Sequence, residues 1–272
     1  MTKPVKSPLR YPGGKSKALG TILPLIPGFN EFREPFLGGG SVLLALLQSN
    51  PSATYWGNDL NQDVYAFWKV LRDEPEILIS KVQATYDSAK RRKLGSPLHK
   101  KLVLERPRTL TDRAVRFFVL NRITFSGTIE AGGFSQSAFE KRFTQSAIDR
   151  LLPVSGIIPD VKFSNDDYES ILKEPGEGVF IFLDPPYVSA TKSRLYGKQG
   201  ILHTTFDHER FASLMKKCKH KWMITYDDSS EVRKLFSFAN FYEWTLQYGM
   251  NNFRQTTAAV GKELIVTNYP IG

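Results

Sequence analysis

The chain has 272 residues, 41% of them hydrophobic and 24% charged, so it can bury a core and does not belong to the disordered class. Its 37 Lys and Arg residues outnumber its 27 Asp and Glu residues, and the net charge of +10 fits either a polyanionic partner or a solubilising surface. The sequence has no apolar run long enough for a membrane span or a secretory signal, so we expect a cytoplasmic protein. Cys218 has no second cysteine to pair with, and no local cluster of Cys and His residues could bind a metal, so we expect no disulfide and no metal.

The first third of the chain predicts a strand, a glycine turn and a helix. Residues 29–36 suit a strand that runs into Gly38–Gly40, and the apolar residues 41–47 suit a helix with Ser41 as its cap. A second short strand over 53–57 ends at Asn58 and Asp59. This order is typical of an α/β sheet domain.

The segment from Asp59 to about Pro153 predicts helices near 63–71, 75–90 and 111–121, and no strand of the main sheet. Residues 81–150 contain 15 basic and 6 acidic side chains, so this segment carries +9 of the total charge. A solvated helix normally alternates charges of opposite sign, whereas an unbalanced basic block is typical of a segment that binds phosphates. An exposed basic face without a partner remains the alternative. We therefore interpret the segment as a helical insert that interrupts the sheet domain.

The last third of the chain returns to strands. Residues 161–163 lead to Asn165–Tyr168, and the wholly apolar run 179–183 predicts a strand buried on both faces of a parallel sheet, which stops at Asp184–Tyr187. A helix near 211–218 and strands over 222–226 and 264–267 follow. The pattern predicts an open α/β sheet, at whose carboxyl strand ends ligands bind.

Two of these strand ends form a candidate nucleoside site. In Glu34–Gly40 the glycines allow close approach to a ligand, and Asp59 stands where a carboxylate can bind both hydroxyls of a ribose. Leu43 replaces the third glycine of the dinucleotide pattern, which favours a nucleoside without pyrophosphate. The alternatives are a tight turn at the glycines and a helix cap at Asp59.

The acidic residues before Tyr168 add a weaker signal to this site. Asp167 could accept from the amino group of an adenine while Tyr168 packs on the ring, but a capping role for Asp167 before the following helix fits equally well. The neighbouring Asp166 leaves open which carboxylate would contact the adenine.

The most specific motif is Asp184-Pro185-Pro186-Tyr187, at the end of the most buried strand. Two prolines prevent both helix and ladder hydrogen bonding, so the loop is rigid and its carbonyls are free to accept. A carboxylate beside such a carbonyl can bind both N–H protons of a nucleobase amine and stabilise charge that develops on it. Tyr187 can stack on the base, which must first leave the duplex.

Taken together, these motifs resemble the Dam-like class of DNA N6-adenine methyltransferases over almost the whole chain. Arg10-Tyr11-Pro12-Gly13-Gly14-Lys15 looks like the N-terminal motif of that family, Glu34–Gly40 like its S-adenosylmethionine loop, Asp59 like its ribose-binding acid and Asp184–Tyr187 like its catalytic motif. The resemblance implies a Rossmann-like methyltransferase sheet interrupted by a mainly helical DNA-recognition insert with a β-hairpin. It also implies that Tyr11 and Lys15 lie beside the cofactor and that Asp184 holds the target amine.

From the motifs and this resemblance we expect residues 1–62 and 154–272 to form the catalytic domain and residues 63–153 the target-recognition domain. Leu120-Asn121-Arg122 and the region of Gly127 resemble the start of the family's DNA-reading hairpin. Residues 128–135 lack the arginine and tyrosine that GATC-specific members have after this point, so no GATC target is predicted. The expected cofactor contacts are Tyr11, Lys15, Glu34, Phe36, Gly38, Gly39, Gly40, Asp59, Asp167, Tyr168 and Asp184. The expected DNA contacts are Arg10, Lys90, Arg91, Arg92, Lys93, Arg116, Asn121, Arg122, Ser126, Lys141 and Arg142.

The predicted reaction is methyl transfer from S-adenosylmethionine to the N6 amine of a flipped adenine in double-stranded DNA, by a monomer with a possible cognate restriction endonuclease. Methylation of cytosine C5 needs a cysteine nucleophile, and Cys218 lies far from every strand-end motif. Amino methylation of cytosine and a DNA-binding regulator without turnover remain the alternatives.

Overall fold

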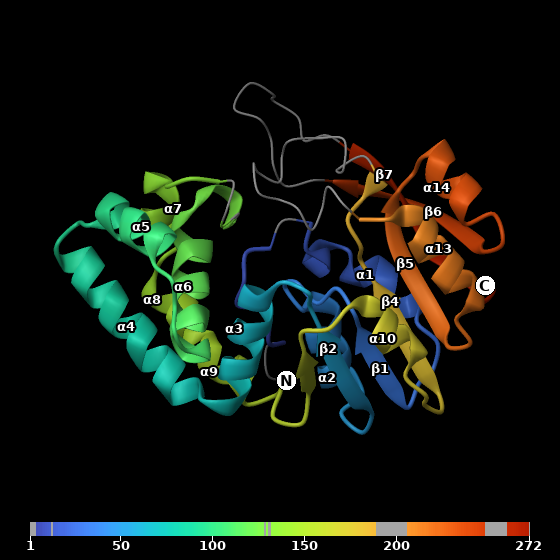
Figure 1. The fold of residues 1–272 in the computed structure, drawn as a ribbon, viewed down its shortest axis with the longest axis horizontal. Helices are drawn as coiled ribbons and strands as arrows, with labels where there is room; N and C mark the ends of the chain where they lie inside the picture. Colours follow the sequence, from blue (N-terminus) through green and yellow to red (C-terminus); the bar gives the residue numbers. More distant parts are fainter. Residues whose placement is uncertain are drawn as a thin grey trace.

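The computed structural model describes residues 4–11, 13–127, 129, 132–188, 206–247 and 260–271. Seven strands form one sheet in the order β3-β2-β1-β4-β5-β7-β6 (Figure 1). Neighbours from β3 to β5 pair in parallel, whereas β7 pairs antiparallel with both β5 and β6. The strands are β1 (Glu31–Glu34), β2 (Thr54–Asn58), β3 (Lys162–Ser164), β4 (Val179–Leu183), β5 (Lys221–Asp227), β6 (Asn240–Gln247) and β7 (Val260–Thr267).

Strand β4 is buried at every position, as its apolar sequence predicts. Phe180 and Phe182 belong to a core cluster that includes residues of the helix after β1, while Ile181 and Leu183 belong to a second cluster that includes Phe211. Because alternate side chains of a strand point to opposite faces, the two clusters lie on the two sides of the sheet. The helices that accompany the sheet are η1 (Lys15–Lys17), α1 (Leu19–Ile22), η2 (Leu23–Leu25), α2 (Ser41–Ser49), α10 (Tyr168–Lys173), α13 (His208–Lys217) and α14 (Ser230–Leu235).

A helical insert lies between β2 and β3 and forms the left side of Figure 1. Its helices are α3 (Gln62–Asp73), α4 (Pro75–Arg91), α5 (Gly95–Leu104), α6 (Leu110–Ile123), η3 (Phe125–Gly127), α7 (Gln136–Lys141), α8 (Gln145–Asp149) and α9 (Leu151–Ser155). The three predicted helices are confirmed as α3, α4 and α6, and Phe67 of α3 stacks on Phe118 of α6 with ring centroids 5.8 Å apart. Within the described ranges, none of the helices is long and apolar enough to span a membrane.

The expected β-hairpin of the insert falls partly outside the described residues. An antiparallel bridge joins Thr124 to Phe134, and the amide of Phe125 donates to the carbonyl of Gly133 at 3.2 Å. Thr128, Glu130 and Ala131 are not among the described residues. The bridge therefore fixes the base of a chain reversal at the C-terminal end of α6, and the hairpin itself stays a prediction.

The predicted cap of α2 is wrong. Ser41 is the first helical residue, and Gly40 precedes it in a left-handed conformation with φ of 61° and no side chain to cap the helix. Glycine adopts this conformation without steric cost. The cap comes instead from Glu34 at the end of β1, whose Oε2 accepts from the amide of Leu43 at 3.0 Å.

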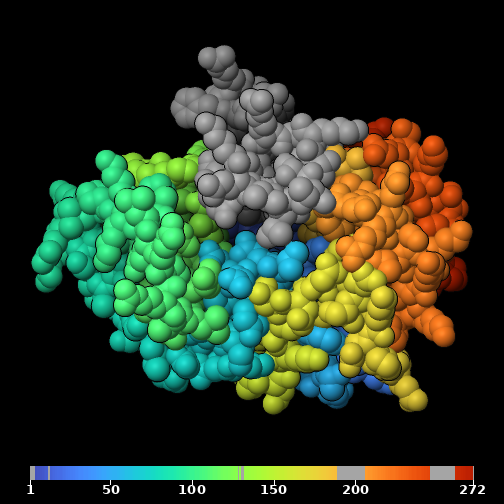
Figure 2. Space-filling view, viewed as in Figure 1, coloured from blue at the N-terminus to red at the C-terminus, as the bar shows by residue number. Residues whose placement is uncertain are grey.

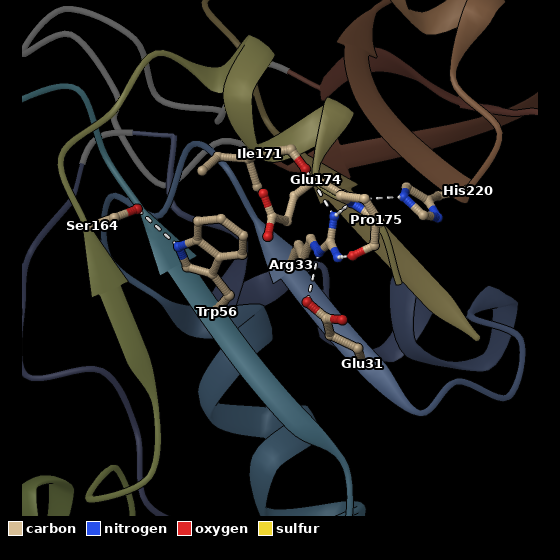
Figure 3. Close-up of polar contacts among 8 residues, drawn as sticks. All are labelled: Glu31, Arg33, Trp56, Ser164, Ile171, Glu174, Pro175 and His220. Atoms are coloured by element: carbon tan, nitrogen blue, oxygen red, sulfur yellow. Dashed lines mark hydrogen bonds and ion pairs between the residues drawn. The ribbon is translucent and has the colours of Figure 1, made fainter. Parts of the chain in front are cut away.

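A buried arginine links β1 to the end of α10 and the residues that follow it (Figure 3). Arg33 is 0% exposed and donates to the carbonyls of Ile171, Glu174 and Pro175 and to the carboxylate of Glu31, at 2.6 to 3.0 Å. A guanidinium has five N–H donors, so this set of acceptors offsets much of its burial. The contact ties the end of α10 to β1.

Candidate active site

The two sharpest motifs of the sequence meet at one edge of the sheet. β1 pairs in parallel with β4, with Glu31 opposite Val179 and Arg33 opposite Ile181, although about 150 residues separate the two strands along the chain. β1 leads into Glu34–Gly40, and β4 leads into Asp184–Tyr187. The strand order reverses between β1 and β4, and such a switch point is where open α/β sheets bind ligands.

Lys15 and Asp184 form an ion pair at this switch point. The Lys15 ammonium lies 2.6 and 2.7 Å from the two carboxylate oxygens of Asp184 and 3.0 Å from the carbonyl of Gly13, and the lysine is 5% exposed. Thr225 of β5 donates its hydroxyl to Oδ1 of Asp184 at 2.8 Å. The sequence predicted that Lys15 and Asp184 share the site, but carried no signal for Thr225, which lies inside a strand without a motif.

Tyr187 is fixed by a carboxylate that sequence analysis did not identify. Its hydroxyl donates to Oε2 of Glu263 at 2.6 Å, its ring lies 5.2 Å from the Lys15 ammonium, and the ring of Tyr226 packs beside it. Burial is the main cause that raises the pKa of Tyr187 well above its usual range and the pKa of Glu263 to about 7. Glu263 comes from β7, which lies two strands away from β4.

The glycine loop is shaped by two aromatic side chains. Gly38 has φ of 45°, and a Cβ there would lie 2.7 Å from the ring of Tyr11. Gly40 has φ of 61°, and a Cβ there would lie 2.9 Å from the ring of Trp68, whose indole N–H donates to the carbonyl of Gly38 at 3.0 Å. Tyr11 therefore lies against the loop, while its expected contact with the cofactor stays a prediction. Trp68 of α3 was missed because it follows no motif.

Two carboxylates stand beside this loop. Oδ2 of Asp59 accepts from the amide of Gly38 at 2.8 Å and Oδ1 accepts from the amide of Asn61 at 2.9 Å. Burial raises the pKa of Asp59 to about 6, and these two amides oppose the shift. Glu34 is 3% exposed, and burial raises its pKa well above the usual range while the amide of Leu43 lowers it.

The predicted adenine contacts lie on the side of the sheet that carries α10. Asp167 caps α10 by accepting from the amide of Glu169 at 2.9 Å, and its side chain remains exposed, as does that of Asp166. Tyr168 is 8% exposed, and its ring packs at 5.4 Å from both Phe36 and Phe211. Phe36 is partly exposed, so this aromatic cluster offers an apolar surface beside the glycine loop.

The predicted DNA-binding side chains divide into engaged and open groups. Lys90 donates to the carbonyl of Phe139 and lies over that ring at 4.3 Å, and Arg116 binds Asp63 at 3.1 Å and the carbonyl of Leu102 at 2.7 Å. These two basic groups hold the helical insert together. The open group, which is solvent-exposed, contains Arg91, Arg92, Lys93, Lys141 and Arg142.

The side chain of Asn121 joins the N-terminal segment to the insert by hydrogen bonds to backbone groups. The amide of Arg10 donates to the side chain of Asn121 at 3.0 Å, and that side chain donates back to the carbonyl of Arg10 at 2.8 Å and to the carbonyl of Gly127 at 3.3 Å. Asn121 is 1% exposed. Asn121 therefore acts as a structural link beneath the base of the expected hairpin, and Ser126 next to it has φ of 54°.

Comparison with known proteins finds a matching family model and several similar relatives. The family model of the D12 class N6 adenine-specific DNA methyltransferases matches residues 11–250. The Type II methyltransferase M1.LlaDCHI of Lactococcus lactis subsp. cremoris is 23% identical over 274 residues, which cover 96% of this chain and 94% of that protein. The DNA adenine methylase of Vibrio cholerae is 24% identical and covers 84% of this chain and 83% of its own length. The DNA N-6-adenine-methyltransferase of Escherichia phage P1 is 25% identical over 87% of this chain, which spans 32% of that longer protein.

Proposed function

Because the chain belongs to the D12 class of N6 adenine-specific DNA methyltransferases, we propose that its switch-point site transfers a methyl group from S-adenosylmethionine to the N6 amine of a flipped adenine, with Asp184 as the acceptor for that amine. The observation that carries this assignment is the convergence of Asp184, Lys15 and the glycine loop at adjacent strand ends. The activity class follows from the family, and the roles of the residues are the proposal.

The residues at the end of β1 and β2 suit a nucleoside cofactor. Asp59 presents a carboxylate beside the amide of Gly38, and a carboxylate there can accept from both ribose hydroxyls. The partly exposed ring of Phe36 supplies an apolar surface for the base. When bound, S-adenosylmethionine supplies a methyl group on a positively charged sulfur, so the protein has only to orient and hold the reactants.

Asp184 and Pro185 suit the target amine. The amine of adenine is a poor nucleophile because its lone pair is delocalised into the ring. If one N–H donates to Asp184 and the other to the carbonyl of Pro185, the pyramidal form is favoured and the developing positive charge is stabilised. No donor to the Pro185 carbonyl occurs among the described residues, and Lys15 and Thr225 hold the Asp184 carboxylate in place.

The target base has to leave the duplex to reach this site. Unstacking costs a few kcal/mol, and an aromatic side chain that stacks on the flipped base offsets part of it. We assign this role to Tyr187, and the hydrogen bond that its hydroxyl donates to Glu263 supports the assignment by restricting the ring. The basic side chains of the insert bind the remaining duplex by its phosphates.

The partners follow from the same assignment. We propose that the protein acts as a monomer on double-stranded DNA in the cytoplasm. A relative named as a type II methyltransferase spans the chain at 23% identity, which supports a cognate restriction endonuclease as partner.

The test is a transfer assay with labelled S-adenosylmethionine and unmethylated duplex DNA, followed by digestion and separation of the nucleosides. We expect label in N6-methyladenine and none in N4-methylcytosine, and a loss of more than about a thousandfold in rate for Asp184→Ala. Asp160→Ala, at an exposed loop position before β3, is the matched control. Label in cytosine, or equal transfer by the Asp184→Ala variant, contradicts the proposal.

A further inference from the structure

The side chain of Asn121, in the last turn of α6, is engaged by backbone groups on every side. Its Oδ1 accepts from the amide of Arg10 at 3.0 Å, and its Nδ2 donates to the carbonyl of Arg10 at 2.8 Å and to the carbonyl of Gly127 at 3.3 Å. A carboxamide has two N–H donors and one acceptor oxygen, so each of these groups has a partner within the protein. Asn121 is also 1% exposed, which leaves almost none of it open to a ligand.

The partners of Asn121 belong to two different segments. Gly127 lies in the chain reversal that follows α6, and Arg10 begins the segment that leads to Lys15. The two segments also touch directly, because Gly127 has φ of 76° and a Cβ there would lie 2.3 Å from the carbonyl oxygen of Arg10. The reversal and the N-terminal segment are therefore in close contact beside Asn121.

The other end of the N-terminal segment is fixed at the catalytic motif. Lys15 donates to the two carboxylate oxygens of Asp184 at 2.6 and 2.7 Å. Between the two ends, the ring of Tyr11 lies where a Cβ at Gly38 would be, 2.7 Å from that position. The segment therefore has one anchor at Asp184 and the other at the backbone of Arg10.

We propose that Asn121 is a positioning residue for methyl transfer, an assignment that rests on the proposed function: by holding the backbone of Arg10, it sets where Lys15 presents its ammonium to Asp184. This role takes the place of the DNA contact that the resemblance implies for Asn121. Because the segment is short and both of its ends are fixed, a shift at one end is passed to the other. A displacement of about 1 Å at a reacting group can slow a reaction about a hundredfold.

The experiment compares the full chain with its Asn121→Leu variant, which has a similar shape and no amide. Single-turnover methyl transfer at saturating duplex DNA and S-adenosylmethionine should slow about tenfold to a hundredfold. The Kd for DNA and its salt dependence should stay within about twofold of the wild type, because no phosphate contact is lost. Weaker DNA binding with an unchanged saturated rate is the pattern of a DNA contact, and it overturns the proposal.

Thermal unfolding separates positioning from a purely structural role. Asn121→Leu leaves the buried amide and carbonyl of Arg10 without their partner, so it should unfold about 4 to 8 °C lower than the wild type. Rates are therefore compared per folded molecule, well below the unfolding temperature of the variant. A purely structural asparagine would leave that rate at the wild-type value, which also overturns the proposal.

Two glycines of the chain reversal give a matched pair that keeps Asn121 in place. Gly127→Ala brings a methyl group against the carbonyl of Arg10, whereas no heavy atom lies within 4 Å of a Cβ at Gly133. Both glycines have positive φ, 76° and 56°, so the backbone strain of an alanine is common to the two variants. At saturating DNA, Gly127→Ala should transfer methyl groups about tenfold more slowly than Gly133→Ala. Equal rates overturn the proposal even if Asn121→Leu does not fold.

The same assay distinguishes this inference from the proposed function. If the wild type places no label in adenine, the proposed function fails. If the wild type methylates adenine and Asp184→Ala does not, while Asn121→Leu and Gly127→Ala transfer as fast as the wild type, the positioning role alone is wrong.

Discussion

The individual residues of the site are groups whose charge is controlled by burial. Lys15 neutralises Asp184, whereas Asp59, Glu34 and Glu263 are carboxyl groups whose pKa is raised because they are removed from water. Glu34 and Asp59 lie at the carboxyl ends of β1 and β2, whereas Glu263 lies within β7. Raised pKa values of buried carboxyl groups are typical of functional sites, and this criterion is independent of the motifs.

Asp59 gives a prediction for pH. Its pKa is raised to about 6, so below pH 6 the Asp59 carboxyl group is protonated in the free protein. It has to lose this proton before it can accept hydrogen bonds from both ribose hydroxyls. Affinity for S-adenosylhomocysteine should fall by about tenfold per pH unit below pH 6 and be flat above pH 7. Calorimetric titration from acidic to neutral pH measures this change.

The control for this prediction is Asp59→Asn, which cannot titrate. It should bind the cofactor product more weakly than the wild type at pH 7 and show no step near pH 6. A step of the same size in both proteins would assign the titration to another group. The sign for stability follows from the same shift, since ionised Asp59 costs folding free energy above about pH 6 and this cost is relieved as the carboxyl protonates.

Among the elements of the fold, the glycine loop after β1 is the most constrained segment of the site. Gly38 combines a positive φ with a ring of Tyr11 that fills the space of a Cβ. Gly38→Ala should therefore displace Tyr11, lower the free energy of unfolding by about 1 to 3 kcal/mol and weaken cofactor binding. Chemical denaturation and a cofactor titration test the two effects.

Gly28→Ala is the matched control for the loop variant. No heavy atom lies within 4 Å of a Cβ built at Gly28, and its φ lies outside the left-handed region, so the change should be close to neutral for stability and binding. Equal effects of the two substitutions would mean that Tyr11 can move away without consequence.

Strands and helices with a clear hydrophobic pattern could be predicted, and those without one could not. Val179–Leu183 was predicted because it is apolar throughout, whereas β6, whose sequence is Asn240–Gln247, mixes exposed polar and aromatic positions as an edge strand does. The short helices α7 and α8 lie in a stretch rich in Ser and Thr, and α9 contains Pro153, so helix propensity is weak in all three.

The candidate site shows the same division. Motif residues such as Asp59 and Asp184 were predicted at strand ends, because the position of a parallel strand end follows from the strand itself. Glu263 and Trp68 were missed, because their roles depend on which strands and helices become neighbours, and no local pattern carries that information. The cap of α2 was assigned to Ser41 for the same reason, since Glu34 reaches it across the glycine turn.

Across the molecule, the charge is divided between two lobes. Figure 2 shows the helical insert, in cyan to green, on one side and the later strands, in yellow to orange, on the other. Residues 81–150 carry +9 of the net charge of +10, so the rest of the chain, which contains the catalytic motifs, is nearly neutral. Long-range attraction to a polyanion therefore acts mainly on the insert.

The open basic residues of the insert give a prediction for the salt dependence of DNA binding. Replacing Arg91, Arg92 and Lys93 by glutamine should flatten this dependence by up to about three units of slope, one for each phosphate that is no longer neutralised. The three side chains are exposed at the end of α4. Filter binding or fluorescence anisotropy at several salt concentrations measures the slope.

Lys90→Gln is the contrast for this triple variant. The Lys90 ammonium is bound to the carbonyl of Phe139 and lies over its ring, so its loss should lower the unfolding temperature and leave the slope nearly unchanged. If the salt dependence of DNA binding is the same in the triple variant as in the wild type, Arg91, Arg92 and Lys93 are solvated side chains that do not contact DNA.

The pairing of β1 with β4 also bears on how the molecule forms. The two strands are neighbours in the sheet, yet the whole helical insert and two other elements of the sheet lie between them in the chain. Contacts between residues so far apart form late and slowly, because closing a long chain segment has an entropic cost. During synthesis the insert can complete its local helical packing before β4 leaves the ribosome, so the ability to hold DNA should arise before the ability to modify it.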